Sequence, residues 1–422
     1  MKYIHSFEEL ISLDSWLPVE RKREIAEFLI HVIPQFQNYR NQYIRELSRD
    51  EMNLDSKDRN EPAWTAVSRT NSQSGWRLIL GLNDQKCAYR KTDPLQSGCF
   101  NCGFYSDTET TEKATVRSVL NQLQAALEHG KQTNQAFDVI EFLSDGSFLT
   151  DLSNPVKEAL INEVAKLSYI KRLLIESRPD GIVKNEEFIR RIVRRLGRER
   201  SLEIATGMET ADEFIRTTCI HKGFTKKDFE QGLETIARIN REEKTNISYL
   251  AYILIKPAFL TSEESIIDAV KTLEYLNGLM KASEVKIIPK LEPATLPEGT
   301  LFMVLHNLEK SHPFHYRVIN YWAILEILVR ANSYTSCKEI FQQVRIGERN
   351  DMGSNLYLPG IYDAIDETKF LPEDSVLYKA IQEFNYDHDI NRVLSALQGM
   401  DLQSLKRWSE SELNKNSRIR IP

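Results

Sequence analysis

From Gly75 onward the chain alternates between short apolar segments and amphipathic segments, and this alternation restricts its fold more than any other feature. The apolar segments with the length of buried strands are Arg77–Gly81, Asp138–Leu143, Arg172–Glu176, Leu202–Thr206, Ile247–Ile255 and Val285–Ile288. Helices are predicted between them at Glu112–His129, Pro155–Leu167, Glu186–Leu196, Lys226–Asn240 and Ser262–Gly278. The strands return about every 30 to 40 residues, a spacing typical of right-handed crossovers in a parallel sheet.

Six countable strands are fewer than the eight of a closed barrel. We therefore expect an α/β fold, a partial (β/α)6 barrel with helical extensions at both ends. The periodicity alone also allows a flat doubly wound sheet. Three regions are expected, namely a helical N-terminal extension over residues 1–75, the barrel over 76–300 and a mainly helical region over 301–422.

The two extensions carry recognisable local signals. Ser6 followed by Glu9 predicts a capping box, and a second helix is expected after Pro18. The stretch Arg49–Ser74 is charged and then rich in Ser, Thr and Asn, which predicts a loop or linker. In the C-terminal region, helices are predicted at Tyr316–Ala331, Val376–Leu397 and Leu402–Trp408.

Composition argues against several classes of protein. With 422 residues, 41% of them hydrophobic, the chain can bury a large core. No apolar run reaches the roughly 18 to 20 residues of a membrane span, and the charged N-terminus lacks the apolar centre of a signal peptide. Five unevenly spaced cysteines do not suggest a secreted disulfide framework, so we expect a cytoplasmic protein. The net charge of −6 argues against a surface devoted to nucleic acid.

Three of the five cysteines, Cys87, Cys99 and Cys102, lie in one short stretch, whereas Cys219 and Cys337 are far away. Three thiolates without a local fourth suit a structural zinc site poorly, because such a site takes four ligands. They suit a [4Fe-4S] cluster in which cysteines bind three irons and the fourth iron is open. The stretch follows the first barrel strand and so lies at the rim where barrel enzymes build their sites. A zinc site or a set of buried thiols is the alternative.

Cys99 and Cys102, with two residues between them, resemble half of the cysteine motif of the radical S-adenosylmethionine (SAM) superfamily. The first gap departs from that motif, since eleven residues separate Cys87 from Cys99 where the superfamily usually has three. Asn101 also replaces the usual apolar residue before the last cysteine. The residues that could contact the adenine in its place are Phe100, Phe104 and Tyr105.

Later segments narrow the resemblance. In order along the chain they are Leu143–Asp151, Leu174–Ile182, Glu203–Phe229, Ala251–Val270 and Gly299–Leu305. Together they resemble the branch that contains the radical SAM subunit of archaeosine synthase, itself related to the elongator-type radical enzymes. The ordered set is far more specific than any one segment.

The resemblance implies an iron–sulfur enzyme that cleaves SAM reductively. The methionine amino and carboxylate groups would bind the open iron, and one electron would then break the S–C5′ bond. The 5′-deoxyadenosyl radical so formed would abstract hydrogen from the substrate. Reduced flavodoxin or ferredoxin is the electron donor that the superfamily implies.

The resemblance also points to cofactor-binding residues at strand ends. Ser144, Gly146 and Ser147 follow the second strand, where the superfamily often contacts the methionine amino group; a simple turn is the alternative. Arg178, after the third strand, would pair with the methionine carboxylate, unless it lies on the surface or pairs with Glu176.

Further candidates follow the fourth and fifth strands. Glu209 would accept hydrogen bonds from the ribose hydroxyls, or would cap a helix. Lys256 would contact a carboxylate or a substrate phosphate, or would be a surface lysine. His221 and Lys222 are candidate catalytic residues that contact the substrate. Cys219 would donate a hydrogen atom, although such a cysteine is more often a small buried hydrophobe.

A run of arginines and a group of three histidines are further candidates for binding sites. The run RRIVRRLGRER places five arginines in one positive stripe at helical spacing: Arg190, Arg191, Arg194, Arg195 and Arg198. The stripe would bind tRNA phosphates or would simply be a solvated helix face. The histidines His306, His312 and His315 lack the spacing of a compact metal-binding pair, so we expect no metal there.

The leading hypothesis is a radical SAM enzyme that acts on a nucleoside-like or other small metabolite, by C–N cleavage, sulfur insertion or rearrangement. The acidic net charge and the absence of cysteines after Cys337 favour it. The first alternative is a tRNA-modifying radical SAM enzyme of the archaeosine-synthase type, which would use the arginine stripe. The second is a zinc-stabilised binding protein without enzymatic activity.

Overall fold

The computed structural model describes residues 6–51, 60–69, 75–83, 87–93, 95, 97–103, 114–144, 146–319, 321–347 and 372–398. Strands in these ranges form one eight-stranded sheet in which neighbours in sequence are also neighbours in space. They are β1 (Trp64–Arg69), β2 (Trp76–Gly81), β3 (Phe137–Leu143), β4 (Arg172–Glu176), β5 (Ser201–Glu209), β6 (Ser248–Ile255), β7 (Ile287–Pro293) and β8 (Arg345–Ile346). β1 runs antiparallel to β2, and each later pair is parallel.

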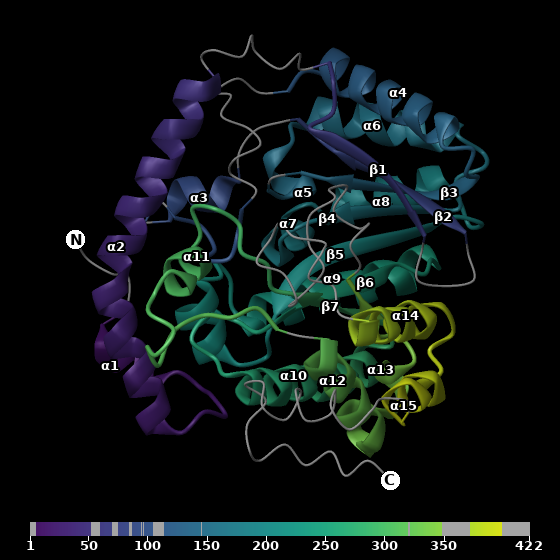
Figure 1. Cartoon of the computed structure of the whole chain (residues 1–422). Helices are drawn as coiled ribbons and strands as arrows, with labels where there is room; N and C mark the ends of the chain where they lie inside the picture. The colour runs from purple at the N-terminus through teal and green to yellow at the C-terminus, as the bar shows by residue number, and fades with distance from the viewer. Residues whose placement is uncertain are drawn as a thin grey trace.

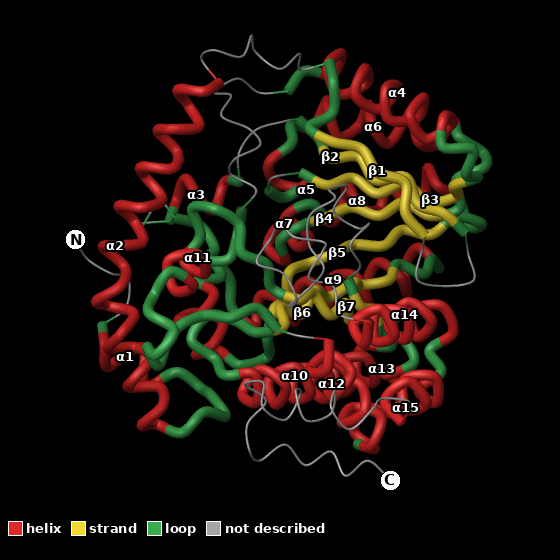
Figure 2. Tube along the Cα trace, viewed as in Figure 1, coloured by secondary structure: helices red, strands yellow, loops and turns green. Residues whose placement is uncertain are grey.

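The sheet curls into an open half-barrel with helices along its outer side (Figure 2). The helices between its strands are α3 (Ala88–Thr92), α4 (Val116–Gln132), α5 (Phe148–Asp151), α6 (Asn154–Lys166), α7 (Pro179–Lys184), α8 (Glu186–Leu196), the π-helix η2 (Ile215–Ile220), α9 (Lys226–Glu243) and α10 (Ser262–Ser283). This architecture confirms the predicted partial barrel, and the six predicted strands correspond to β2–β7. The flat doubly wound alternative is therefore wrong.

Helices dominate both ends of the chain, as predicted. At the N-terminus lie α1 (Phe7–Ser12), which has the predicted capping box between Ser6 and Glu9, and α2 (Val19–Glu51). After β7 come α11 (Leu301–His306), α12 (Tyr321–Ser333), the short 3-10 helix η3 (Thr335–Cys337), α13 (Lys338–Phe341), α14 (Pro372–Asp387) and α15 (Ile390–Gln398). The helix predicted at Leu402–Trp408 lies outside the described residues. The expected boundaries near residues 75 and 300 stay a prediction.

The loop predicted for Arg49–Ser74 is wrong in part, because β1 lies within it. β1 is a short edge strand that pairs with β2 on one side only. Polar residues flank it in the sequence, so no strand pattern is recognisable there. Trp64 pairs with Gly81 of β2, where an added Cβ would lie 2.5 Å from the indole nitrogen. The indole therefore fills the space that a side chain at position 81 would need.

The two faces of the sheet bury different kinds of side chain. Outward-facing residues such as Leu78, Phe142 and Ile204 join the helices in the main hydrophobic core. The inner face has only a small apolar cluster, made by Leu174, Ala205, Leu250 and Ile288. Charged residues share this inner face, so the lumen of the half-barrel is polar.

The N-terminal helices pack against the end of the barrel where its parallel strands finish. Figure 1 shows α2 running along one side of the molecule beside α11. Its Phe36 belongs to a second core cluster with Phe100, Phe214 and Phe302. Asp212 of the barrel holds the segment before α2, accepting hydrogen bonds from the Ser15 hydroxyl at 2.7 Å and the Trp16 amide at 2.9 Å. Among the described helices, none is long and apolar enough to cross a membrane.

Replacing Asp212 with alanine should loosen this docking. The substitution leaves three donors without their acceptor, from Ser15, Trp16 and Ile215, in a buried place. We expect the free energy of unfolding to fall by about 1–3 kcal/mol, measured by urea denaturation. Glu24→Ala, at an exposed position on α2, is the control and should change it little. Equal effects of the two substitutions would contradict the docking role.

Candidate functional site

The three clustered cysteines lie at the carboxyl end of β2. Cys87 directly precedes α3, and the Cys102 amide donates a hydrogen bond to the Cys99 carbonyl at 3.2 Å, which closes a tight turn. All three side chains are half-buried. Burial raises the pKa of the Cys99 thiol, the positive charge of Lys222 opposes that rise, and the neighbouring Cys87 adds to it. Cys99 thus lies within electrostatic range of both groups.

Asp93 organises the segment between Cys87 and Cys99. Its carboxylate accepts hydrogen bonds from the amides of Leu95, Ser97 and Gly98. His221 Nε2 lies 2.9 Å from the same carboxylate, across 128 residues of sequence. Burial opposes ionisation of Asp93, yet the hydrogen bond and charge of His221, with the amides of Ser97 and Leu95, lower its pKa to about 2.

Phe100 fixes the second half of the loop that carries Cys87, Cys99 and Cys102, here called the cysteine loop. Its ring stacks on His221 at 4.8 Å between centroids and meets the edge of Phe36 at 5.5 Å. Its amide donates to the Ile220 carbonyl, and its carbonyl accepts from the Leu301 amide. The structure places this ring in the core, and its predicted contact with adenine stays a prediction. Phe104 and Tyr105 lie outside the described residues.

Asp151 joins the cysteine loop to the loop after β3. Its Oδ2 accepts hydrogen bonds from the Ala88 amide at 3.2 Å and from the Ser147 amide at 2.9 Å. Between these elements lies Gly146, where an added Cβ would come within 1.9 Å of Asp151 Oδ2 and 2.9 Å of the Cys87 Cα. The close approach requires glycine at this position.

The predicted serines take different places in this loop. Ser147 is buried, and its hydroxyl lies 2.8 Å from the Ser177 hydroxyl and accepts from the Arg178 amide at 3.3 Å. It therefore ties the β3 loop to the β4 loop. The buried Ser144 hydroxyl, by contrast, has no hydrogen-bond partner among the described residues. A buried hydroxyl of this kind is available to a ligand.

Arg178 lies at the end of β4 with its guanidinium between two rings. The Tyr89 centroid is 4.9 Å away and the Phe224 centroid 5.4 Å. Its Nη2 donates to the Gly223 carbonyl, and its Nε pairs with Asp180 at 3.2 Å. Arg178 thus forms its ion pair with Asp180 rather than with the predicted alternative partner, Glu176.

Glu209 and Lys222 form an ion pair of 2.6 Å beside Cys99. Glu209 ends β5 with a left-handed backbone, φ +63°, at a bulge in the pairing with β6. Bulges of this kind redirect side chains and are common near active sites. Burial disfavours the charge of Lys222, but Glu209 and Cys99 raise its pKa, so the lysine stays charged.

Lys256, just after β6, is buried and also has a positive φ of +66°. Its Nζ donates to the Ser262 hydroxyl at 3.3 Å and lies 5.6 Å from the Tyr316 ring centroid. The surface-lysine alternative is therefore wrong. Two polar residues with left-handed backbones at the ends of adjacent strands mark this rim as strained, a feature that clusters at functional sites.

Cys219 comes two residues before His221, whose ring stacks on Phe100 of the cysteine loop. It is fully buried on η2 within the second core cluster, and burial raises its pKa well above the ordinary value. Its predicted hydrogen-donor role, like the catalytic roles of His221 and Lys222, stays a prediction. His306 and His315 instead contact backbone carbonyls, of Tyr316 and Leu308.

The arginine stripe on α8 is paired with acidic side chains of this chain. Arg190 contacts Glu186, Glu242 and Glu243, and Arg194 contacts Glu243. Arg191 and Arg195 both contact Glu158 of α6. The positive charge that the sequence suggests for tRNA phosphates is therefore largely neutralised within the molecule.

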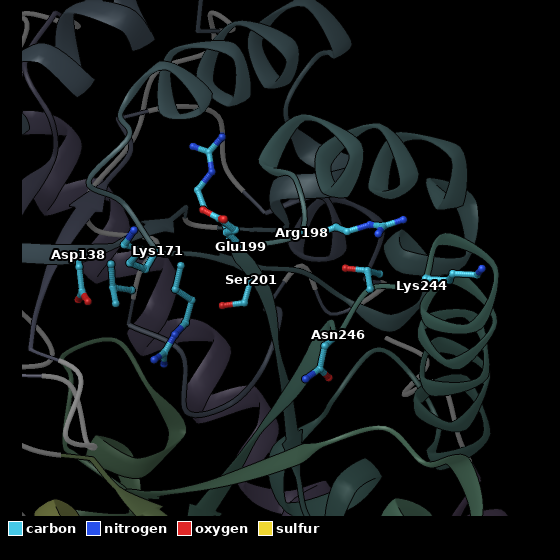
Figure 3. Close-up of a pocket in the computed structure, with 11 residues that line it drawn as sticks. Asp138, Lys171, Arg198, Glu199, Ser201, Lys244 and Asn246 are labelled. Atoms are coloured by element: carbon cyan, nitrogen blue, oxygen red, sulfur yellow. The ribbon is translucent and has the colours of Figure 1, made fainter.

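A cavity of about 450 Å³ lies at the other end of the barrel (Figure 3). Residues at or just before the amino ends of β3–β6 line it, among them Asp138, Lys171, Arg198 and Lys244. Since the cysteines follow the carboxyl end of β2, this cavity is separate from the site described above.

The residues at the rim fit an iron–sulfur cluster with SAM by their chemistry. Three half-buried thiols provide soft ligands for iron. Gly146 has no side chain, which lets its backbone lie close to the Cys87 backbone. The Ser144 hydroxyl has no hydrogen-bond partner among the described residues. Within the described ranges, no three Cys, His, Asp or Glu side chains are gathered closely enough to hold a metal ion. Ligation by the three cysteines thus stays a prediction.

Comparison with known proteins gives the family. No family model matches the chain. An uncharacterized protein of Methanocaldococcus jannaschii is 30% identical over 280 residues, which cover 64% of this chain and 70% of that one. Archaeosine synthase subunit beta of Methanosarcina acetivorans is 24% identical over 65% of this chain and 72% of its own. The same subunit of Thermococcus kodakarensis is 24% identical over 82% and 94%.

The chain belongs to a radical SAM branch related to archaeosine synthase. The resemblance predicted from the ordered motifs is thereby confirmed. Among solved structures, queuine lyase from Clostridium spiroforme bound to SAM and queuine has a TM-score of 0.36 and 17% identity, over 55% of this chain and 80% of that one. That likeness is too distant to bear on function.

Sequence reasoning missed three residues of this rim, namely Asp93, Asp151 and Tyr89. Their partners come from other loops, and the Asp93–His221 contact spans 128 residues. Asp151 is the last residue of Leu143–Asp151, one of the segments that carry the family resemblance. This position was the one sign in the sequence that pointed to any of the three.

Substituting Gly146 with alanine should disturb the cysteine loop more than the fold. The new methyl group would push Asp151 and the backbone at Cys87 apart. After anaerobic reconstitution, we expect iron and sulfide per chain to fall by half or more, with the melting temperature lowered by only a few degrees. Gly278→Ala on α10, where nothing lies within 4 Å, is the matched control and should keep full iron. Equal iron in both variants would refute the spatial argument.

Proposed function

We propose that the chain is a radical SAM enzyme that cleaves SAM reductively and abstracts hydrogen from a nucleoside-like or other small metabolite. The observation that carries the proposal is the meeting of Cys99, Lys222, Glu209 and Arg178 at one rim of the half-barrel. Thiols, a cation, a carboxylate and a stacked guanidinium are the groups that an iron–sulfur cluster and a zwitterionic nucleoside would require. The family supports the same chemistry.

Each rim residue has a role in this proposal. Cys87, Cys99 and Cys102 hold the cluster, and the loop with Ser144, Gly146 and Ser147 receives the methionine amino group. When bound, the cluster and SAM supply a 5′-deoxyadenosyl radical.

The charged residues orient SAM. Arg178 would leave Asp180 to pair with the methionine carboxylate, a stronger contact when bidentate. Lys222 pairs with Glu209 at 2.6 Å, and the Glu209 carboxylate would accept hydrogen bonds from the ribose hydroxyls. Lys256, just after the neighbouring strand β6, remains a candidate contact for a substrate phosphate or carboxylate. His221 and Lys222 are the proposed contacts to the substrate, and Cys219 remains a candidate hydrogen donor behind them.

The proposal also covers the domain organisation, the electron donor, the cellular location and the reaction type. Residues 1–75 and 301–422 are extensions of a barrel over 76–300, and α2 covers the loops at the rim. Reduced flavodoxin or ferredoxin supplies the electron, and the enzyme works in the cytoplasm. The reaction after hydrogen abstraction is a C–N cleavage, a sulfur insertion or a rearrangement, and so of lyase or transferase type.

SAM cleavage should depend on the clustered cysteines. After anaerobic reconstitution and reduction with SAM present, wild type should form 5′-deoxyadenosine slowly, and Cys99→Ala should form none above background. Chromatography of the nucleoside products measures both. Cys337→Ala, which removes a buried thiol remote from the rim, is the control and should keep the activity. Zinc in place of iron and sulfide, with no cleavage, would support a zinc-stabilised binding protein instead.

A second candidate function is modification of tRNA, since two relatives are archaeosine synthase subunits. The pairing of the α8 arginines argues against it. We therefore expect only weak tRNA binding in gel-shift assays at 50 mM salt, lost at 200 mM salt, and unchanged in the variant Arg191→Ala/Arg195→Ala. Tight binding that survives 200 mM salt and weakens at least tenfold in this variant would favour tRNA as the substrate.

A further inference from the structure

The cavity at the amino ends of β3–β6 has a strongly basic lining (Figure 3). Two carboxylates line it, those of Asp138 and Glu199. Against them stand five cationic side chains, namely Lys171, Arg172, Arg198, Arg200 and Lys244. The difference, 5 − 2, gives the cavity a net charge of +3 in a chain whose net charge is −6. Such a local excess of positive charge attracts anions.

Two of the five cations have structural partners. Arg200 donates hydrogen bonds to the carbonyls of Leu196, at 2.7 Å, and Ala165, at 3.1 Å, so it caps the end of α8 and joins it to α6. Arg172 pairs with Glu203 of β5 at 3.7 Å. These two arginines contribute positive charge to the cavity, but their side chains are already engaged.

The other three cations, Lys171, Arg198 and Lys244, are exposed. None of them forms an ion pair or a side-chain hydrogen bond with another residue that the structure describes. Each comes from a different loop, since they precede β4, β5 and β6 in turn. Figure 3 shows Lys171 on one side of the cavity, and Arg198 with Lys244 on the other. A ligand with more than one anionic group matches this spread of charge better than a single anion does.

Hydrogen bonds fix the backbone of the loops that carry these cations. The Lys171 amide donates to the Asp138 carbonyl at 2.7 Å, and the Ser201 amide donates to the Lys171 carbonyl at 2.9 Å. In the third loop, the Asn240 side chain accepts from the Ile247 amide at 2.7 Å and donates to the Ile247 carbonyl at 3.0 Å. Fixed loops lower the entropy cost of gathering the three cations around a ligand.

Lys244 has a backbone conformation that favours a different residue. It ends α9 with a left-handed φ of +51°. Glycine is the usual residue where a helix ends with a positive φ, as α8 does at Gly197, φ +74°. A lysine at this position costs stability, and its side chain makes no ion pair or hydrogen bond within the described part of the chain to offset the cost. Strain of this kind at a residue that lines a cavity indicates a binding role.

The rest of the lining restricts the class of ligand. The remaining residues that the structure describes around the cavity are Val139, Ser201, Thr245 and Asn246, so no aromatic ring and only one apolar side chain are among them. The volume of about 450 Å³ is that of a site for a small molecule. A ligand here would be recognised by its charged groups rather than by a stacked base or an apolar body.

We propose that this cavity binds a small ligand with two linked phosphate groups, held by Lys171, Arg198 and Lys244. A diphosphate group carries several negative charges and acceptor oxygens, which match three cationic donors. The ligand would bind at the opposite end of the strands from the cysteines. The inference is therefore independent of the chemistry proposed for the rim.

Equilibrium binding of inorganic pyrophosphate to the anaerobically reconstituted full chain tests the proposal. By isothermal titration at pH 8, without phosphate in the buffer, we expect pyrophosphate to bind wild type at least tenfold more tightly than sulfate at 50 mM salt. The affinity should fall at least fivefold at 200 mM salt, because salt screens exposed charges. ADP, which carries the same group on a nucleoside, should bind about as tightly. Tighter binding of ADP would identify the diphosphate as that of a nucleotide.

Variants at exposed positions locate the binding. Arg198→Ala and Lys244→Gly should each weaken pyrophosphate binding at least fivefold. Lys244→Gly also relieves the left-handed backbone, so its melting temperature should equal or exceed that of wild type, which a merely structural role would not combine with lost binding. Glu199→Gln removes a negative charge and should tighten binding at least twofold. Lys166→Ala, in the last turn of α6 and outside the cavity lining, is the matched control and should stay within twofold of wild type.

Four outcomes would overturn the proposal. They are pyrophosphate binding no tighter than sulfate, unchanged affinity in both Arg198→Ala and Lys244→Gly, an equal loss in Lys166→Ala, and displacement of pyrophosphate by tRNA at a lower concentration of phosphate groups. The last result would assign the cavity to an RNA backbone instead of a small ligand. Failure of the rim chemistry has a different signature, namely no 5′-deoxyadenosine from wild type while pyrophosphate binding persists.

Discussion

The parallel arrangement of β2–β8 is the constraint on which the rest of this structure depends. Because each strand pairs with its sequence neighbours, every connection returns the chain to the same end of the sheet. Loops that carry Cys87, Ser147, Arg178, Glu209 and Lys256 therefore meet at one rim, although 169 residues of sequence, 256 − 87, separate the first from the last. A sheet with reversed strands would scatter these residues between two ends.

Sequence patterns predict most of the fold because periodicity follows burial. The helix expected over Glu186–Leu196 has these bounds in the structure, and β2–β7 occur where apolar segments lie. β1 and β8 were missed because an edge strand in polar sequence and a two-residue strand leave little pattern. The rim was predictable from the barrel rule. Its supports were not, since Asp93 and Asp151 act through partners 128 and 63 residues away.

Charge patterns were the least informative part of the sequence. The run of five arginines suggests a binding surface, yet carboxylates from neighbouring helices pair with the four of them that lie on α8. Glu158 and Glu243 come from α6 and α9, so only the packing of the helices reveals the pairing. Glu176, in contrast to these arginines, lies in no charged run of the sequence. Only the structure shows that it accepts a hydrogen bond from the Tyr252 hydroxyl.

Glu209, His221 and Lys256 share a left-handed backbone, with φ values of +63°, +56° and +66°. Each such conformation costs a residue with a side chain about 1–2 kcal/mol relative to glycine. Selection for heat resistance alone would thus favour glycine at these positions and erase the ion pair, the Asp93 contact and the buried lysine together. Engineering of a sturdier variant should therefore leave these three positions untouched and seek its gains in the outer helices.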